Sequence, residues 1–350
     1  MVVLVKKQQG EQIMKRIAIN GFGRIGRLAF RQLFNQKGIE IVAINNIAVE
    51  PKMLAHLLKY DSMQGRFEYA NKTSIDGDNL VIDGKKIRIL GEMDAAKLPW
   101  AELKIDAVLE CTGVFTSYDK CKLHIDAGAK KVILSAPAKD AMPTVVFGVN
   151  HDILKASDNI ISAASCTTNC LAPMAKALDD LAGIKSGFMT TIHAYTGDQN
   201  VLDGPHRNGD MRRARAAAVN IVPNSTGAAK AIGLVVPSLA GKLDGAAQRV
   251  PVATGSITEL NVVVDKKVTA DEVNKFMKGR QSDSFEYSDE ELVSSDVIGT
   301  TAGSIFDATQ TRVLPLENGG SLVKVAAWYD NEMGYVCQMA RVLKYVLELK

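Results

Sequence analysis

The sequence predicts two domains of different fold class, an α/β domain followed by an α+β domain. In the first half, short apolar runs alternate with helix-like segments, which is typical of βαβ units and a parallel sheet. After about residue 165, longer alternating runs follow one another without regular helices between them, which indicates a mainly antiparallel sheet covered on one face. A length of 350 residues is sufficient for two or three domains.

In the first half, the spacing of apolar residues locates the elements. Strands are expected at residues 17–20, 39–45, 107–110, 132–135 and 144–149. Between the first two strands, Leu28, Leu33 and Phe34 recur at roughly helical spacing before Gly38, which predicts a helix. Residues 75–90 differ, because Asp-Gly pairs separate alternating runs and predict a hairpin.

In the second half, a helix is expected over residues 166–180, ended by Gly183, because apolar residues share one helical face: Leu171, Ala175, Leu178 and Ala182. Strands are expected at 188–195, 256–265 and 321–330. Residues 196–225 hold four arginines but little periodicity, and a loop of that length is uncommon unless it is functional. The chain ends in one apolar helical stripe: Met339, Val342, Leu343, Val346 and Leu347.

These patterns divide the chain into four parts. Residues 1–14 are a polar, aperiodic extension, to which we assign no function. The first domain is expected over 15–165 and the second over 166–331. Residues 332–350 are expected to form a helix that packs back on the first domain.

Composition and charge exclude several classes of protein. Hydrophobic residues make up 47% and charged residues 23% of the chain, which excludes a disordered protein. The net charge of +3 does not favour binding to nucleic acid or to a membrane surface. No apolar run approaches the roughly 18 residues of a membrane span, and the first residues do not resemble a signal peptide, so we expect a cytoplasmic protein. Five cysteines imply no disulfide framework.

A glycine motif indicates a Rossmann-type dinucleotide-binding domain. Gly21, Gly23 and Gly26 form the pattern G-x-G-x-x-G between a predicted strand and a predicted helix. Such glycines allow a tight turn and a close approach of the backbone to a pyrophosphate at the helix N-terminus. The alternative is a plain glycine-rich turn. Twenty residues after Gly26 stands Asn46, where dinucleotide folds usually have an acid that holds the ribose.

A cysteine and a histidine form the candidate catalytic pair. Cys166 opens a predicted helix, and a helix N-terminus favours an anion and lowers the pKa of a thiol. His193 ends a predicted strand 27 residues later and is able to reach it. A Cys–His pair suits covalent catalysis on a carbonyl, in which the thiolate attacks and the imidazole moves the proton.

Alternatives remain for these and the other cysteines and histidines. Cys166, Cys170 and His193 are a conceivable zinc set, although their spacing is not typical of one. The remaining cysteines are interpreted as small buried hydrophobes: Cys111, Cys121, Cys170 and Cys337. No partner is identifiable for the remaining histidines: His56, His124, His151 and His206.

Six motifs together resemble the phosphorylating glyceraldehyde-3-phosphate dehydrogenases. They are NGFGRIGR (20–27), ASCTTNCLAP (164–173), TTIHAYTGDQ (190–199), NIVPNSTGAAKA (220–231), GAAQRVP (245–251) and WYDNEMGY (328–335). The likeness runs from about Lys15 to the C-terminus, and the motifs stand in the order of the family. It implies an NAD(P)-binding domain followed by a catalytic domain, in a homotetramer.

The resemblance also implies the site residues. Cys166 would be the nucleophile and His193 the acid–base partner. The phosphate of the substrate would bind Thr196 and Arg249. The attacking inorganic phosphate would bind Ser165, Thr167, Thr226 and Gly227. Cofactor contacts would come from the three glycines and from Arg24, Ile25, Asn46, Thr112, Gly113, Ser135, Asn331 and Tyr335.

Some positions depart from the pattern of the family. NAD-using members usually have aspartate at Asn46, and a neutral residue there does not repel the 2′-phosphate of NADP. Pro205 matches the NAD-using members. We therefore expect NAD as cofactor, with weakened discrimination against NADP. Met93 also replaces an arginine that some relatives place near the adenine. Either one of Arg212, Arg213 and Arg215 reaches an anion site, or the three make salt bridges or subunit contacts, and the sequence does not choose among them.

The implied reaction is the glycolytic oxidation of D-glyceraldehyde 3-phosphate, with inorganic phosphate, to 1,3-bisphosphoglycerate. It would pass through a thiohemiacetal and a thioester on Cys166. The alternatives are an NADP-using or dual-cofactor form, an erythrose-4-phosphate dehydrogenase, and a non-enzymatic binding or adhesion protein.

Overall fold

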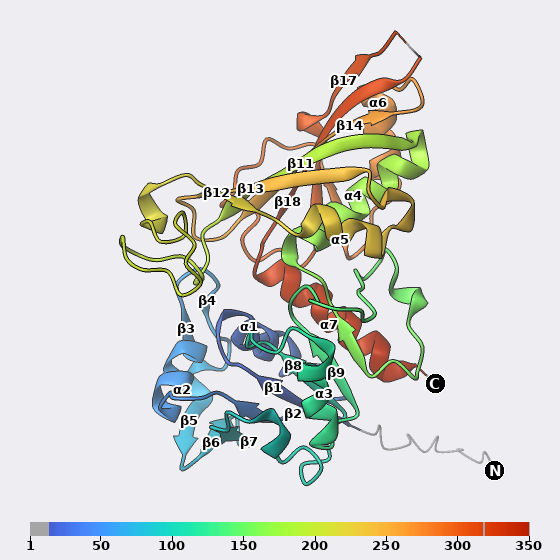
Figure 1. Cartoon of the computed structure of the whole chain (residues 1–350). Coiled ribbons are helices and arrows are strands. Elements are labelled where there is room, and N and C mark those ends of the chain that lie inside the picture. Colours follow the sequence, from blue (N-terminus) through green and yellow to red (C-terminus); the bar gives the residue numbers. More distant parts are fainter. Residues whose placement is uncertain (1–13, 318, 350) are drawn as a thin grey trace, which may run out of the picture.

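The computed structural model describes residues 14–317 and 319–349. They form two bodies, one above the other, joined by a long C-terminal helix that runs down along the lower body (Figure 1). The predicted extension, residues 1–14, lies outside the described residues except for Met14.

The helices are α1 (Arg24–Leu33), α2 (Pro51–Lys59), α3 (Tyr118–Asp126), α4 (Cys166–Ala182), α5 (Ala228–Val235), α6 (Ala270–Lys278) and α7 (Met333–Glu348). The lower body holds strands β1 (Lys15–Asn20), β2 (Ile39–Asn45), β3 (Tyr60–Asp61), β4 (Gly65–Arg66), β5 (Thr73–Asp76), β6 (Asn79–Ile82), β7 (Lys85–Leu90), β8 (Ala107–Glu110), β9 (Lys131–Leu134) and β10 (Ile160–Ser162). The upper body holds β11 (Ile184–Ala194), β12 (Val222–Ser225), β13 (Leu243–Val250), β14 (Ser256–Val264), β15 (Phe285–Ser288), β16 (Ser304–Asp307), β17 (Arg312–Pro315) and β18 (Ser321–Tyr329).

The lower body is the α/β domain that the sequence predicts. Its sheet has the order β10-β9-β8-β1-β2-β7-β6-β5, and the strands from β10 to β7 run parallel. The predicted hairpin is present as β5, β6 and β7, which pair antiparallel. It is not a separate excursion, because β7 also pairs with β2 and so extends the main sheet.

One predicted strand, at residues 144–149, is wrong. Only Thr144 makes an isolated bridge there, with Ser162, and the strand at this edge of the sheet is β10. Val145 and Val146 are fully buried, so they are apolar because they fill the cores and not because they lie in a strand. A short apolar run does not distinguish these two cases. Gly148 then turns the chain, with a φ of 84°.

The upper body holds the second, largely antiparallel sheet. Its order is β12-β13-β11-β14-β18-β16-β15, with β17 paired to β18. The three predicted strands are confirmed as β11, β14 and β18, and two pairs, β11–β13 and β15–β16, are parallel. Buried residues alternate along β14, because helices cover one face of the sheet: α4, α5 and α6. The predicted helix at 166–180 is confirmed as α4, which Gly183 ends with a φ of 71°.

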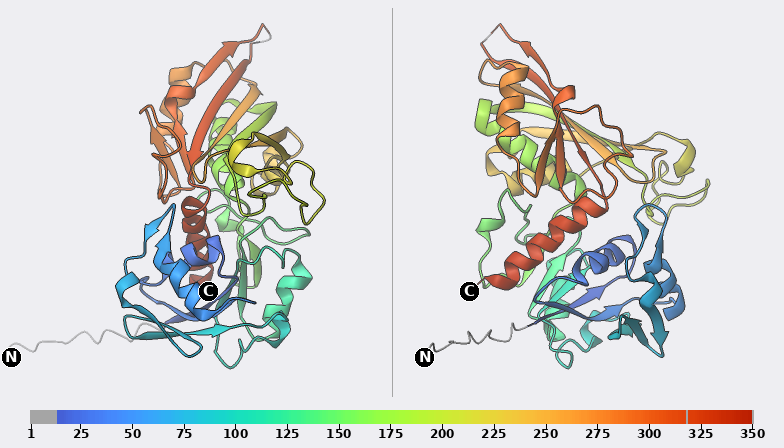
Figure 2. Two further views of the ribbon diagram at one scale, coloured as in Figure 1. Left: turned by 90° about the vertical axis from the view of Figure 1, so that its left-hand side faces the viewer. Right: turned by 180° about the vertical axis from the view of Figure 1, so that it is seen from behind.

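Helix α7 belongs to the core of the lower body, although it follows the upper body in sequence. Its residues Met339, Val342, Leu343 and Val346 are buried in one hydrophobic cluster with residues of β1 and α1, and Leu347 packs against this cluster. Figure 2 shows α7 lying along the lower sheet from behind. Among the described residues, no helix combines the length and apolar character that a membrane span needs.

Candidate active site

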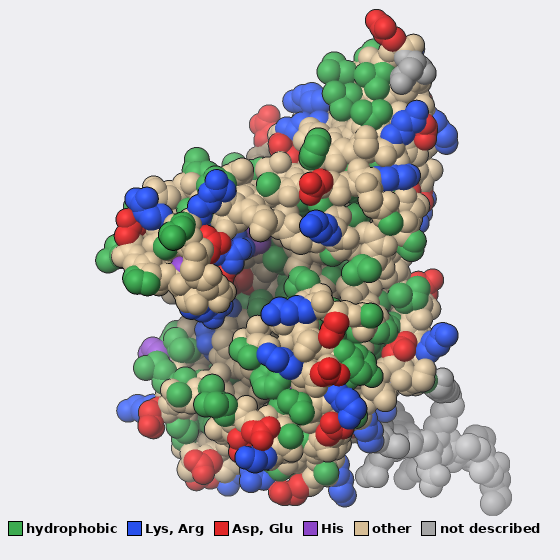
Figure 3. Space-filling view, viewed as in Figure 1, with side chains coloured by type: hydrophobic (Ala, Val, Ile, Leu, Met, Phe, Trp, Pro, Cys, Tyr) green, Lys and Arg blue, Asp and Glu red, His purple; other side chains and the backbone are tan. Residues whose placement is uncertain are grey.

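The carboxyl ends of the parallel strands meet at one edge of the lower sheet, where ligands bind in folds of this kind. The glycine turn follows β1, Asn46 follows β2, Thr112 follows β8 and Ser135 follows β9. Together with neighbouring residues, the first three of these segments line a cavity of about 360 Å³. Figure 3 shows the surface hollowed between the two bodies beside the loop of residues 196–225.

The glycine turn has the shape that a dinucleotide needs. Gly21 has a φ of 89°, and a Cβ there would lie 2.7 Å from the backbone nitrogen of Thr112. A Cβ on Gly26 would lie 2.0 Å from the carbonyl oxygen of Gly21, so this glycine lets α1 pack against the turn. Nothing lies within 4 Å of a Cβ on Gly23, so this face is open to a ligand at the N-terminus of α1. The turn therefore fits a pyrophosphate.

Asn46 supports the glycine turn. Its Oδ1 accepts a hydrogen bond from the backbone N–H of Phe22 at 2.9 Å, and its Nδ2 reaches only the carbonyl of Ile47, at 3.4 Å. Asn46 and Met93 both line the cavity. The side chain therefore presents an amide donor, and not a carboxylate, to a ligand there.

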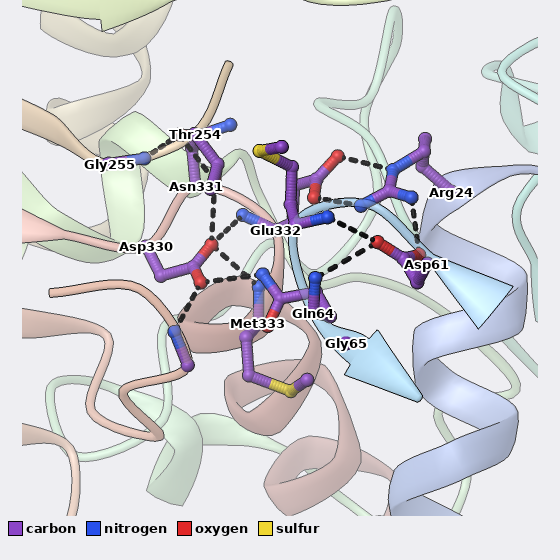
Figure 4. Close-up of polar contacts among 12 residues, drawn as sticks. Arg24, Asp61, Gln64, Gly65, Thr254, Gly255, Asp330, Asn331, Glu332 and Met333 are labelled. Atoms are coloured by element: carbon purple, nitrogen blue, oxygen red, sulfur yellow. Dashed lines mark hydrogen bonds and ion pairs between the residues drawn. The ribbon is translucent and has the colours of Figure 1, made fainter. Parts of the chain in front are cut away.

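The guanidinium of Arg24 is bound by protein carboxylates. Its nitrogens form ion pairs with Asp61 and Glu332, and these charges raise its pKa (Figure 4). Ile25, predicted beside it under the cofactor, packs against the hydrophobic core. If both residues lie under a pyrophosphate, as predicted, the contact would therefore come from the backbone of the first turn of α1 and not from the Arg24 charge.

Asn331 lies at the junction of the two bodies, with one end of its side chain fixed. Its Oδ1 accepts a hydrogen bond from Ser256 Oγ at 2.9 Å. It also accepts from the N–H of Gly255 at 3.2 Å and from Thr254 Oγ1 at 3.4 Å (Figure 4). No acceptor among the described residues pairs with its Nδ2. That group remains as a donor, which is what an amide-bearing nicotinamide ring requires.

The remaining predicted cofactor residues are placed in three ways. Thr112 lines the cavity, and Gly113 follows it with a φ of 71°. Ser135 follows β9, and its N–H donates to the carbonyl of Glu110 at 2.9 Å. Tyr335 is buried in α7, and its hydroxyl donates to the carbonyl of Ala164 at 3.2 Å, two residues before Cys166.

Helix α4 and strand β11 bring the predicted catalytic pair together. Cys166 is the first residue of α4, and Ser165 caps this helix by accepting from the N–H of Thr168 at 3.0 Å. His193 lies near the end of β11, and its Nε2 is 3.5 Å from Sγ of Cys166. Cys170, the third member of the zinc alternative, instead donates to the carbonyl of Ala327 at 3.4 Å. No metal-binding group of three or more His, Cys, Asp or Glu residues occurs within 14–317 and 319–349.

The backbone fixes the proton of His193. Nδ1 lies 2.7 Å from the carbonyl oxygen of Ala194, which only accepts, so Nδ1 carries the proton. Nε2 is then a free base that faces the sulfur of Cys166. Burial, together with the charge of Arg249, lowers the pKa of His193 to about 3.

The pKa of Cys166 differs from the sequence expectation. Burial raises it, and this effect outweighs the positive charge of Arg249 and the hydrogen bonds from Thr167 and from the backbone at the start of α4, which lower it. The prediction of a lowered pKa at the start of α4 is therefore wrong for the net pKa of Cys166, although the backbone there acts in the predicted direction. The resting pair is a thiol beside a neutral imidazole, ready for proton transfer between the two.

The predicted substrate-phosphate residues lie beside His193. Arg249 of β13 is the register partner of His193 in the parallel β11–β13 pair. Its Nη1 donates to Thr196 Oγ1 at 2.9 Å and to the carbonyl of Ala194 at 3.3 Å, while its Nε is buried without a partner. A buried guanidinium with an unused donor, next to a threonine hydroxyl, favours a bound anion.

The second predicted phosphate group lies at two helix N-termini. Thr226 and Gly227 precede α5, which packs on α4, and Thr226 Oγ1 accepts from the N–H of Ala228 at 3.2 Å. Ser165 and Thr167 lie on either side of Cys166. The hydroxyl of Thr167 is directed inward, 3.1 Å from the hydroxyl of Tyr329.

Two residues near the site were not singled out from the sequence. Arg213 alone of the three loop arginines reaches inward: it pairs with Asp198, and its Nε donates to Asn224 Oδ1 at 2.9 Å. Tyr329, in the WYDNEMGY motif, lies behind the pair, with its hydroxyl also 2.8 Å from Thr191 Oγ1 and its ring 5.9 Å from that of His193. The available sequence signal for Tyr329 was its place near the end of the strand predicted at 321–330, within the motif WYDNEMGY.

Comparison with known proteins places this geometry in a family. Residues 15–118 match the NAD binding domain of glyceraldehyde 3-phosphate dehydrogenase, and residues 165–331 match its C-terminal domain. The chain belongs to the glyceraldehyde-3-phosphate dehydrogenase family. It is an oxidoreductase of this family and uses a nicotinamide dinucleotide.

Curated relatives match almost the whole chain. A glyceraldehyde-3-phosphate dehydrogenase of Clostridium acetobutylicum is 58% identical over 336 residues, which cover 96% of this chain and 99% of that protein. The enzyme of Clostridium pasteurianum is 57% identical with the same coverage, and that of Streptococcus pyogenes is 56% identical over 95% of this chain and 98% of its own. The resemblance found from the motifs is confirmed.

Proposed function

We propose that the protein catalyses the oxidation and phosphorylation of D-glyceraldehyde 3-phosphate to 1,3-bisphosphoglycerate in glycolysis, with NAD as the preferred cofactor. The contact of 3.5 Å between Sγ of Cys166 and Nε2 of His193 carries the proposal. Arg249 and Thr196 support a phosphorylated substrate, because they offer an anion site next to this pair.

The first step forms a bond between sulfur and carbon. As Sγ of Cys166 attacks the aldehyde carbon, its proton passes to Nε2 of His193 and then to the carbonyl oxygen, which gives a thiohemiacetal. The N–H groups at the start of α4 stabilise the oxyanion before it is protonated. Arg249 and Thr196 hold the phosphate of the substrate and so orient the aldehyde toward the sulfur.

The second step breaks the carbon–hydrogen bond of the thiohemiacetal. A nicotinamide bound here would supply the acceptor for the hydride, and the Nδ2 donor of Asn331 would be suited to hold its carboxamide. Nε2 of His193 removes the hydroxyl proton at the same time, which leaves a thioester on Cys166.

The third step transfers the acyl group to phosphate. An oxygen of inorganic phosphate attacks the thioester carbon, the carbon–sulfur bond breaks, and the sulfur regains a proton from His193. Ser165 and Thr167 at the start of α4, and Thr226 and Gly227 before α5, are proposed to bind this phosphate, because each pair offers backbone N–H groups at a helix N-terminus. The inward position of Arg213 favours it as the arginine that completes the anion site.

The preference for NAD over NADP is expected to be weak. The amide of Asn46 is able to donate to a ribose hydroxyl, but it brings no charge against a 2′-phosphate. No lysine or arginine is among the residues that line the cavity, so no cation favours the additional phosphate of NADP there.

We also propose a cytoplasmic homotetramer. The five cysteines are free, as is usual in a reducing compartment. Large apolar side chains are exposed on the outer face of the second sheet and in the loop, and subunit contacts would cover them: Phe188, Leu322, Val201, Leu202 and Ile221. Light scattering of the purified protein measures the assembly.

Side-by-side reduction of NAD and of NADP tests the proposed reaction, with glyceraldehyde 3-phosphate and saturating inorganic phosphate. We expect turnover with NAD, a smaller rate with NADP, and no net turnover without phosphate. Turnover with erythrose 4-phosphate that does not need phosphate would instead support the alternative substrate. Absence of reduction with either cofactor would contradict the proposal.

A further inference from the structure

Behind the cofactor cavity lies a buried polar cluster that the reaction does not use. Its members are Glu110, His124 and Trp100, all without solvent exposure, and Asn20 and Asn45, which are 2% and 4% exposed. Asn20, Asn45 and Thr112 line the cavity, while Glu110, His124 and Trp100 lie behind it. From the sequence alone, no partner was found for His124, and the structure corrects this.

One chain of hydrogen bonds begins at Trp100. Its indole N–H, which only donates, is 3.0 Å from Nδ1 of His124, so Nδ1 must be the acceptor. The proton of the neutral ring then lies on Nε2, which donates to Oε2 of Glu110 at 3.1 Å. Trp100 thereby fixes both the orientation and the tautomer of His124.

A second chain reaches the same oxygen from the backbone. The N–H of Glu92 donates to Oδ1 of Asn45 at 2.9 Å, which fixes the orientation of this amide. Asn45 Nδ2 then donates to Asn20 Oδ1 at 2.7 Å, and Asn20 Nδ2 donates to Oε2 of Glu110 at 2.6 Å. Asn20 Nδ2 and His124 Nε2 lie 3.4 Å apart because both donate to this oxygen.

The other oxygen of Glu110 holds the opposite wall of the cavity. Oε1 accepts from the N–H of Thr112 at 2.8 Å and also from its hydroxyl. The backbone of Thr112 in turn lies against Gly21, where it leaves no room for a Cβ. One carboxylate therefore connects the ends of β1, β2 and β8 around the glycine turn.

We propose that Glu110, oriented by His124 and Trp100, is a positioning residue that fixes the walls of the cavity for the adenosine half of the dinucleotide. The inference rests on the proposed cofactor use. Four donors point at the carboxylate of Glu110: Asn20 Nδ2, His124 Nε2, and the N–H and the hydroxyl of Thr112. The two hydrogen-bond chains fix Asn20 Nδ2 and His124 Nε2 as donors, so neither can act as an acceptor. Only a side chain that accepts at both of its oxygens therefore satisfies all four donors.

Glutamine at this position would keep the shape and remove one acceptor. In either orientation of the new amide, its NH₂ group meets N–H donors, those of Asn20 and His124 on one side or that of Thr112 on the other. A buried donor without an acceptor disturbs its surroundings. We therefore expect Glu110→Gln to raise the Kd for NAD about tenfold, which corresponds to about 1.4 kcal/mol.

Calorimetric titration with NAD and with ADP-ribose, which lacks the nicotinamide, tests the proposal. Glu110→Gln should raise both Kd values by the same factor, and Glu102→Gln, an exposed change in the same domain, should leave both unchanged. Wild-type Kd values in Glu110→Gln, or a loss confined to NAD, would overturn the proposal.

A measurement on the wild-type protein does not depend on the folding of a variant. Long-range ¹H–¹⁵N correlation spectra should show the proton of His124 on Nε2, and a proton on Nδ1 would overturn the assignment. If the wild-type protein bound neither NAD nor ADP-ribose, the proposed cofactor use would fail. Wild-type binding with unchanged affinity in Glu110→Gln would remove the positioning role alone.

Discussion

Nε2 of His193 faces Sγ of Cys166 at 3.5 Å because the carbonyl of Ala194 accepts the proton of Nδ1. The backbone of β11 thus selects the tautomer in which the imidazole is a base toward the sulfur. The positive charge of Arg249, in the neighbouring strand β13, acts to lower the pKa of both Cys166 and His193, although burial raises that of Cys166 overall. The geometry therefore favours proton transfer from the Cys166 thiol to His193, although the pKa of the thiol is raised.

Removing the base should affect turnover and not cofactor binding. Loss of a general base costs about 10² to 10⁴ in rate, so we expect His193→Asn to lower kcat by such a factor and to keep the Kd for NAD. Cys166→Ser should abolish turnover. His56→Asn, on the exposed face of α2, is the control. Stopped-flow measurement of cofactor reduction checks the prediction, and near-normal kcat in either site variant would contradict the assigned roles.

The charge of Arg249 should be visible in the reactivity of Cys166. Because a positive charge favours the thiolate, Arg249→Leu should raise the pKa of Cys166 further. The rise of the iodoacetamide alkylation rate with pH would then shift to higher pH than in the wild type. At neutral pH, the rate should fall about tenfold for each pKa unit by which the thiol pKa increases.

Arg212→Leu provides the matched control, since Arg212 is exposed and contacts only the carbonyl of Pro223 with its side chain. Its alkylation profile should overlay that of the wild type. A profile in Arg249→Leu that does not move, or moves to lower pH, would show that Arg249 does not act on the sulfur.

Asn46 should set the discrimination between the two cofactors. Asn46→Asp would keep the acceptor for the N–H of Phe22 and add a negative charge at the ribose. We expect the ratio of kcat/KM for NADP to that for NAD to fall about tenfold or more, a difference of about 1.4 kcal/mol. Initial rates with each cofactor measure it, and an unchanged ratio would place the ribose away from this side chain.

Local sequence patterns predicted most of the helices and strands, and the candidate catalytic pair of the site. The start of α4 and the end of β11 were visible in the sequence, so Cys166 and His193 could be paired. Arg249 lies beside His193 because β11 pairs in parallel with β13. The periodicity of single segments does not predict the order of strands in a sheet. The resemblance to a family was needed to connect these motifs.

Buried polar partners were the least predictable part of the site. His124 finds Trp100 and Glu110 only after α3 has packed against the sheet, and Tyr329 meets Thr191 across a sequence separation of 138 residues. The strand prediction for residues 144–149 was wrong for a related reason: a buried turn and a buried strand have similar apolar sequences. In each case, tertiary packing determines the partner or the conformation, and local patterns in a single sequence do not predict tertiary packing.

The glycine turn offers a matched pair of changes that separates folding from binding. Gly26→Ala would force a Cβ to within 2.0 Å of the backbone oxygen of Gly21, which the chain cannot relieve with a side-chain movement. We expect a loss of about 1–3 kcal/mol or more in the free energy of unfolding, seen as a lower Tm.

A Cβ added by Gly23→Ala meets nothing within 4 Å, and the φ of −73° at this position is one that alanine adopts. The Tm of this variant should therefore stay near that of the wild type. Its methyl group would instead enter the space proposed for the pyrophosphate at the start of α1, so the Kd for NAD should rise. Thermal unfolding and calorimetric titration of both variants measure these effects, and a Gly23→Ala protein that binds NAD normally would show that the pyrophosphate does not lie over this turn.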